Sequence, residues 1–96
     1  MEFDLHIHSR YSFDCGLKPE KIVRIAKKRG LRGIAIVDHD TCEGGIEGQK
    51  YADPDFIVIP GIEIRTTEGD IIGLFITDPE RPETDDAVKV INWIKE

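Results

Sequence analysis

Residues 33–40, Gly-Ile-Ala-Ile-Val-Asp-His-Asp, decide the fold class of this chain. The uninterrupted apolar run at 34–37 is typical of a strand that is covered on both faces, as the strands of parallel sheets are. The run stops abruptly at Asp38, His39 and Asp40. Because α/β proteins place their ligand sites at the carboxyl ends of parallel strands, this stretch predicts a parallel sheet with a polar site at its edge.

The segment before it, residues 3–8, alternates strictly between apolar and polar side chains. Such alternation predicts a strand with two different faces. The apolar face comprises Phe3, Leu5 and Ile7, and the polar face comprises Asp4, His6 and His8. A helix is predicted between the two strands, from Pro19 to about Arg29, with Gly30 as its stop.

A second apolar run, Phe-Ile-Val-Ile at 56–59, predicts another buried strand, which Pro60 and Gly61 are expected to interrupt. Beyond this interruption, short strands at 62–64 and 71–76 are predicted to pair as a hairpin. The sequence therefore continues the sheet after residue 40, with its last two strands antiparallel.

Two more segments have helical character. The glycine-rich stretch 41–55 predicts a short helix or an irregular turn around 46–52. The last segment predicts a helix with Thr84 as its N-cap, and Asp85 and Asp86 fall in its first turn, where negative charge is favourable. The predicted inner face of this last helix comprises Ala87, Val88, Ile91 and Ile94.

The order strand, helix, strand, irregular helix, strand, hairpin and helix predicts an α/β fold built from parallel βα units. The 96 residues suffice for one small domain, residues 1–96, and exclude two. A crossover helix at the end of the chain should lead to a further strand, which is absent. We therefore expect an unfinished sheet edge, and association as a homo-oligomer or with a missing C-terminal half.

Composition narrows the classes of function. The chain has 13 Lys and Arg against 19 Asp and Glu, a formal net charge of −6, so no basic nucleic-acid surface is expected. No signal peptide or membrane span is apparent, and a cytoplasmic protein is expected. Cys15 and Cys42 are too few for a disulfide scaffold. They are expected to be reduced thiols, with a redox role as a minor alternative.

The three histidines fall at two predicted strand ends. His6 and His8 lie two apart on one strand, so their imidazoles point the same way, about 6.5 Å apart, and can reach one metal ion. His39 lies between two aspartates that could ligate metal or hold the imidazole tautomer. Glu63 interrupts an apolar sequence, where burying a carboxylate is costly unless it is paired or metal-bound. Together these residues predict a metal site.

Each motif also has a structural explanation. His-x-His occurs on exposed edge strands, Asp-His-Asp can form a solvated turn, and Glu63 can face solvent from a half-exposed strand. Asp14 can cap the first loop. Arg10 and Arg65, each two residues beyond a candidate ligand, could bind substrate phosphate or be solvated surface arginines. The occurrence of polar motifs at three successive strand ends favours the functional interpretation.

The motifs HIH at 6–8, DHD at 38–40 and PGIE at 60–63, in this order and spacing, resemble the PHP family, named for polymerase and histidinol phosphatase. The resemblance covers nearly the whole chain. It implies a partial, distorted (β/α)7-type barrel, with two or three divalent metal ions, Zn, Mn or Fe, at its carboxyl-end mouth. It also implies hydrolysis of phosphate esters, with a phosphorylated small molecule or a nucleotide as substrate.

The resemblance assigns roles to individual residues. By it, His6 and His8 bind one metal ion, Asp14 and His39 bind another, and Glu63 bridges the two. Asp70 stands where the family commonly has a further histidine ligand. The residues expected to carry the catalysis are Glu63, His39 and Asp40.

Two later motifs of the family, His-Pro and Asp-x-His, have no counterpart in this sequence. A barrel of this kind needs roughly 200 residues or more, and this chain supplies about half of them. The expected function is therefore a metal-dependent phosphoester hydrolase, and the alternative is a non-catalytic metal-binding or structural module, or an inactive fragment. Metal binding without turnover would favour the alternative.

Overall fold

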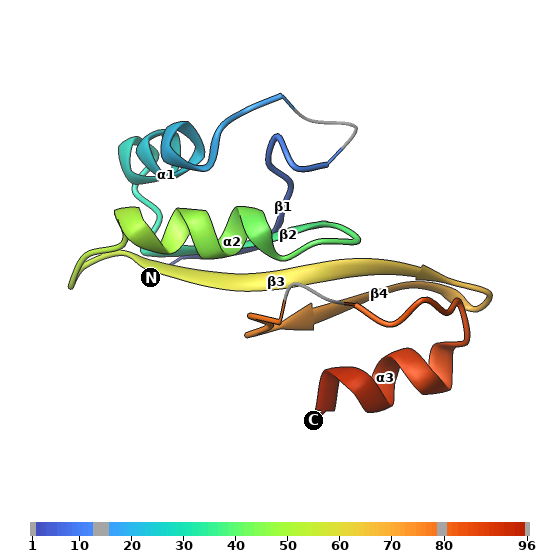
Figure 1. Ribbon diagram of the computed structural model, residues 1–96. Helices are drawn as coiled ribbons and strands as arrows, with labels where there is room; N and C mark the ends of the chain where they lie inside the picture. The colour runs from blue at the N-terminus through green and yellow to red at the C-terminus, as the bar shows by residue number, and fades with distance from the viewer. Residues whose placement is uncertain (1, 13–15, 79–80, 96) are drawn as a thin grey trace.

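The computed structural model describes residues 2–12, 16–78 and 81–95. Four strands and three α-helices form the fold (Figure 1). In chain order the elements are β1 (Phe3–Ile7), α1 (Pro19–Lys28), β2 (Gly33–His39), α2 (Glu43–Gly48) with a 3₁₀ turn η1 (Gln49–Tyr51), β3 (Ile57–Thr66), β4 (Gly69–Leu74) and α3 (Ala87–Lys95). No helix of the described ranges is long and apolar enough to cross a membrane.

The strands form one sheet in the order β1-β2-β3-β4. β1 pairs with β2 and β2 with β3 in parallel, whereas β3 and β4 form an antiparallel hairpin. The predicted parallel βα units and the predicted hairpin are therefore confirmed. Because β1, β2 and β3 are parallel neighbours in the sheet, their carboxyl ends lie side by side at the same edge.

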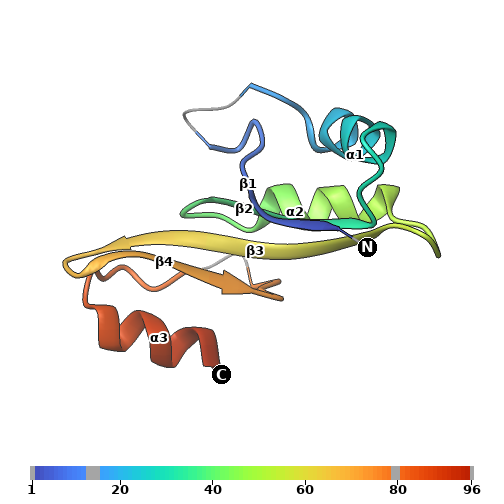
Figure 2. The ribbon, with the colours of Figure 1, turned by 180° about the vertical axis from the view of Figure 1, so that it is seen from behind.

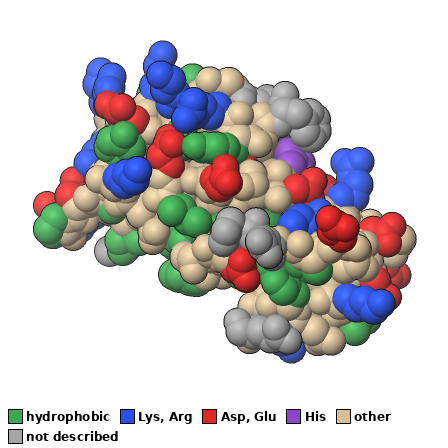
Figure 3. Space-filling view, viewed as in Figure 1, with side chains coloured by type: hydrophobic (Ala, Val, Ile, Leu, Met, Phe, Trp, Pro, Cys, Tyr) green, Lys and Arg blue, Asp and Glu red, His purple; other side chains and the backbone are tan. Residues whose placement is uncertain are grey.

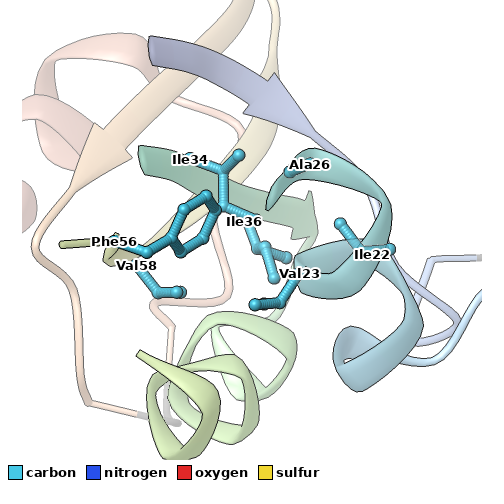
Figure 4. Packing of buried hydrophobic residues seen from close by; sticks show 7 residues of the cluster. All are labelled: Ile22, Val23, Ala26, Ile34, Ile36, Phe56 and Val58. Carbon is cyan, nitrogen blue, oxygen red and sulfur yellow. The ribbon is translucent and has the colours of Figure 1, made fainter. Parts of the chain in front are cut away.

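Two apolar clusters cover one face of this sheet. The first joins α1 to β2 and to the start of β3, and Figure 4 shows its side chains pointing toward one another. Its buried members are Ile22, Val23, Ala26, Ile34, Ile36, Phe56 and Val58. The second joins β3 to α3 and comprises Cys42, Ile62, Ile64, Ile76 and Val90.

The sheet curls so that both clusters form on the same side. Alternation along β3 puts Val58, Ile62 and Ile64 on one face, and the first of these contacts the α1 cluster while the other two contact the α3 cluster. Figures 1 and 2 show α1 and α3 at opposite ends of the molecule. One face can meet both helices only if the sheet bends around, so the sheet forms a half-barrel with its helices outside, as the resemblance implies.

The helix α2 packs directly on the sheet because glycines face it. A Cβ added at Gly44 would lie 2.1 Å from Asp38 Oδ2, and one added at Gly45 would lie 2.5 Å from the Pro60 Cα. These approaches are too close for any side chain. The glycine-rich composition of the segment therefore serves close packing, and the helix starts at Glu43, earlier than the predicted 46–52 region.

The expected interruption at Pro60 is wrong, since β3 runs unbroken from Ile57 to Thr66. The Pro60 carbonyl accepts a hydrogen bond from the Ile76 N–H at 3.1 Å, on the β4 side of the strand. The N–H and C=O of one strand residue point to the same side, so the N–H that proline lacks is not one that pairing with β2 requires. A proline can therefore occupy this position.

The strict alternation predicted for residues 3–8 is also wrong in one respect. The pairing of β1 with β2 shifts by one residue between Asp4 and Ile7. The Phe3 ring lies on the side of the sheet toward which a Gly33 side chain would point, whereas Ile7 packs against the α1 cluster on the other side. Such a shift is typical of a β-bulge, which re-aims side chains near an edge.

The last helix differs from its predicted form at both its cap and its face. Asp86 Oδ1 accepts hydrogen bonds from the N–H groups of Val88 (2.9 Å) and Lys89 (3.3 Å), so Asp86 is the N-cap in place of Thr84. Val90 is the fully buried residue, whereas Val88 and Ile91 are exposed. The contacting stripe is Ala87, Val90 and Ile94, which fits helical spacing i, i+3 and i+7.

Candidate metal centre

Three predicted ligands converge on the concave face of the sheet. The Nε2 atoms of His6 and His8 lie 2.9 and 2.7 Å from the same oxygen, Oε1 of Glu63. The potential ligand atoms of His6, His8 and Glu63 all lie within 4.8 Å of one another. In the described ranges, these three side chains are the group close enough together to hold a metal ion. The two imidazoles come from the end of β1 and the carboxylate from β3, so the curl of the sheet brings side chains together across β2.

Burial differs across this His6–His8–Glu63 cluster. The Glu63 side chain is 6% exposed, the His8 side chain 19% and the His6 side chain 54%. Histidine atoms are visible at the molecular surface in Figure 3. The cluster thus has a buried carboxylate at its base and opens to solvent on the His6 side, which gives a small ligand access to it.

The environment of Glu63 favours its charged form. Burial alone raises the pKa of this carboxyl group, but hydrogen bonds from His8 and His6 outweigh burial, and the net pKa lies below the ordinary value. Glu63 is therefore an anion at neutral pH. A buried anion beside two imidazole nitrogens is a donor set that suits a divalent metal ion.

His39 extends the row of imidazoles from β2. Its ring centroid lies 4.3 Å from that of His8, and the His6 and His8 centroids lie 5.2 Å apart. In the β2–β3 ladder His39 is the direct partner of Glu63. The structure therefore brings four of the predicted residues, His6, His8, His39 and Glu63, to one place.

Asp38 is buried behind this row in a network that the sequence did not indicate. Its carboxylate accepts hydrogen bonds from the Ser9 hydroxyl (2.6 Å), the Ser12 hydroxyl (2.7 Å) and the Ser9 N–H. The Ser12 hydroxyl oxygen accepts a bond from the His39 N–H at 2.9 Å. Asp38 thus ties the loop after His8 to the end of β2, and it holds both histidine-bearing segments. Two serines just after a candidate ligand are the only signal that the sequence offered.

Asp40, on the other side of His39, lies at the surface. Its backbone is left-handed, with φ 62°, and its N–H donates to the Glu63 carbonyl at 2.9 Å. The carboxylate forms an ion pair with Arg81, a residue that the sequence did not single out. Arg81 in turn donates to the carbonyls of Pro82 (2.9 Å) and Thr84 (2.8 Å). Asp40 therefore contacts this loop and the Glu63 backbone.

The other predicted site residues lie apart from the cluster or outside the described ranges. Asp70 pairs with Arg65, with 3.5 Å between its Oδ1 and the Arg65 Nε. Both stand two ladder positions beyond Glu63 and Ile72, and therefore on the same face of the hairpin. Arg10 contacts Tyr11 and Glu47. Asp14 and Cys15 lie outside the described residues.

Cys42 is a core residue. It is fully buried in the α3 cluster, and its thiol donates a hydrogen bond to the Asp78 carbonyl at 3.3 Å. Burial raises the pKa of the thiol, so the less reactive protonated form dominates at neutral pH. This environment gives no support to a redox role for Cys42.

Sequence comparison now adds to the geometry. A profile of the PHP domain matches residues 4–92. The chain belongs to the PHP domain family. Its fold matches that of a two-domain protein from Bacteroides vulgatus that contains a PHP-like domain, with a TM-score of 0.82 at 23% identity over 97% of this chain and 31% of that one.

Relatives of the PHP chain differ in how much is known of them. An uncharacterized protein of Methanocaldococcus jannaschii is 39% identical over the whole chain and 62% of its own length. A 5'-3' exoribonuclease of Haemophilus influenzae is 39% identical over 68% of the chain and 24% of its own length. A structure from Bifidobacterium adolescentis assigned as a metal-dependent phosphoesterase has a TM-score of 0.67 at 32% identity, over 82% of this chain and 29% of that one. The chain thus spans less than two thirds of each.

Proposed function

We propose that this protein is a metal-dependent phosphoester hydrolase whose metal is held by His6, His8 and Glu63. The observation that carries the proposal is the convergence of the two Nε2 atoms on Glu63 Oε1. Membership of the PHP family and the likeness to a metal-dependent phosphoesterase support it. Two imidazoles and a carboxylate suit Zn, Mn or Fe better than Mg or Ca, because imidazole is a borderline ligand.

The donor set fits such an ion. The three potential ligand atoms lie within 4.8 Å of one another, and a cation would take the place of the protons that now join the Nε2 atoms to Glu63 Oε1. When bound, the ion polarises a phosphoryl oxygen and offsets the negative charge that develops in phosphoester hydrolysis. A second or third ion, with His39, Asp14 and Asp70 as ligands, belongs to the same proposal.

The chain's own residues divide the remaining tasks. Glu63 stays ionised and orients both imidazoles through its two hydrogen bonds. His39, beside His8, is the residue we propose to transfer a proton at the reacting centre, because one imidazole ring can both accept and donate a proton. Asp40 is proposed to assist at the same edge, where its N–H is already fixed by the Glu63 carbonyl.

Arg10 and Arg65 are the proposed contacts of the substrate phosphate. Each now faces a carboxylate, Glu47 at 3.4 Å and Asp70 at 3.5 Å, and both arginines are exposed. Exposed ion pairs of this kind contribute about 0–1 kcal/mol, so a phosphate can replace the carboxylate at little cost. The same exchange would release Asp70 for a metal ion.

A non-catalytic PHP module is the second candidate, and the open concave face favours it. Phe3, Ile57 and Ile72 are exposed there, and β1 is an unpaired edge. A face of this kind is typical of a surface that another copy or another segment covers. Such association, with itself or with further βα units, is part of the proposal.

Hydrolysis of p-nitrophenyl phosphate by the metal-loaded protein tests the proposed activity. Glu63→Gln should lower kcat/KM at least about a hundredfold, because it removes the anion of the cluster. The matched control is Glu68→Gln, the same change at an exposed turn position, which should leave kcat/KM within about twofold of wild type. Bound metal without any turnover by the wild type would support the module instead.

A further inference from the structure

Positive charge is concentrated in one segment of this acidic chain. Seven of the 13 Lys and Arg lie in residues 18–32, together with a single acidic residue, Glu20. This segment carries a formal charge of +6, and the rest of the chain carries −12. The chain therefore contains a strongly basic segment although its net charge is −6. The expectation that no basic nucleic-acid surface exists is based on the net charge of the whole chain.

The segment forms α1 and its two ends, and all seven basic side chains are exposed. Lys21, Arg24 and Lys28 follow one another at i, i+3 and i+7, so they form a row on the helix. This row faces away from the side that packs into the core. The blue side chains over α1 gather at the upper left in Figure 3.

Few of these charges are neutralised within the molecule. Arg24 pairs with Glu20 at 3.1 Å and Lys27 with Asp53 at 2.7 Å. The described part of the chain shows no ion pair for the other five, which are Lys18, Lys21, Lys28, Arg29 and Arg32. We call the seven Lys and Arg side chains of residues 18–32 the basic face of α1. Most of their charge is available to a polyanion.

The basic face begins next to the candidate metal centre. The Arg10 N–H donates to the Leu17 carbonyl at 2.7 Å, which ties the residue two after His8 to the start of α1. A hollow of about 180 Å³ lies between β1 and α1, and its lining includes both His8 and Arg29. The N-terminal end of the basic face therefore lies near the metal centre.

We propose that the basic face of α1 binds the phosphate backbone of a single-stranded nucleic acid. A membrane surface fits less well, because the apolar side of α1 is buried in the core and cannot enter lipid. A single row of cations along one helix matches a single backbone. The choice of nucleic acid over another polyanion rests on the proposed phosphoester hydrolysis.

Fluorescence anisotropy with a labelled 20-nucleotide single-stranded DNA tests this surface, in EDTA so that no hydrolysis occurs. The variant Lys21→Gln/Arg24→Gln/Lys28→Gln should bind at least about tenfold more weakly at low salt, and the slope of log K against log salt should fall by about 2. The control Lys50→Gln/Lys89→Gln/Lys95→Gln makes the same charge change elsewhere and should stay within about twofold of wild type.

Equal loss in both triple variants, no loss in the α1 variant, or no binding by the wild type would each overturn the proposal. Tighter binding to phosphatidylserine vesicles than to DNA would also overturn it, in favour of a membrane surface. The α1 variant should hydrolyse p-nitrophenyl phosphate like the wild type. If DNA binding depends on α1 but no turnover occurs with any substrate, the hydrolase fails and the binding surface stands.

Discussion

Asp38 and Asp40 flank the same histidine and have opposite environments. Asp38 is fully buried and accepts three hydrogen bonds from Ser9 and Ser12. Asp40 has a side chain that is 60% exposed, and its carboxylate forms an ion pair with Arg81. The strand places successive even-numbered side chains on one face, but β2 ends between these two residues. One carboxylate is therefore part of the buried structure, and the other lies at the surface in an ion pair.

The largest effect is expected at Asp38. Asp38→Ala leaves two hydroxyl groups and one N–H without their acceptor, in a place sealed by Gly44, and should destabilise the protein by about 3 kcal/mol. Asp38→Asn keeps the shape and one acceptor oxygen, which can take the two hydrogen bonds that Oδ1 accepts, and should cost about 1 kcal/mol. Urea unfolding of both variants measures this difference. Equal, small losses would show that Asp38 is no more structural than Asp40.

Ser12 should have an intermediate effect. Ser12→Ala removes the donor to Asp38 and the acceptor of the His39 N–H, and should cost about 1.5 kcal/mol. Metal affinity should fall with it, because the backbone of His39 loses its anchor. Thr41→Ala, at a nearby hydroxyl that accepts a hydrogen bond from the Glu43 N–H, is the control and should change stability by less than about 0.5 kcal/mol. If Ser12→Ala left the metal affinity unchanged, the hydrogen bonds of Ser12 would not contribute to the metal site.

Asp40 should give the smallest change in stability. Asp40→Ala loses an exposed ion pair and puts alanine at φ 62°, so a cost of about 1 kcal/mol is expected. Asp40→Gly loses the same pair but suits the left-handed backbone, and should lie within about 0.5 kcal/mol of wild type. Thermal unfolding of the two variants distinguishes backbone from charge. A glycine variant as unstable as the alanine variant would mean that the ion pair with Arg81 dominates.

Much of the architecture could be predicted from local pattern. The apolar run at 34–37 and the helical spacing after Pro19 identify β2 and α1, because each depends on near neighbours in the sequence. The convergence of His6, His8 and Glu63 could be expected because parallel strand ends meet at one edge. The family resemblance supplied the (β/α) barrel type, which pattern alone does not distinguish from an open sheet.

The errors have tertiary causes. Pro60 continues a strand because its missing N–H faces away from β2, which depends on the sheet order and not on local sequence. Val88 is exposed because the stripe of α3 that packs on the sheet is Ala87, Val90 and Ile94, and this choice of face depends on tertiary packing. The hydrogen bonds of Asp38 with Ser9 and Ser12 join residues that are 29 and 26 positions apart in the sequence. A pattern of near neighbours therefore could not predict them.

The central claim is that His6, His8 and Glu63 bind a metal ion in common, and elemental analysis of the purified protein tests it most directly. We predict that the wild type retains about one equivalent or more of Zn, Mn or Fe, and that His6→Ala/His8→Ala retains less than about a tenth of that amount. Circular dichroism should show that both proteins are folded. The same metal in the same amount in the folded double variant would contradict the account.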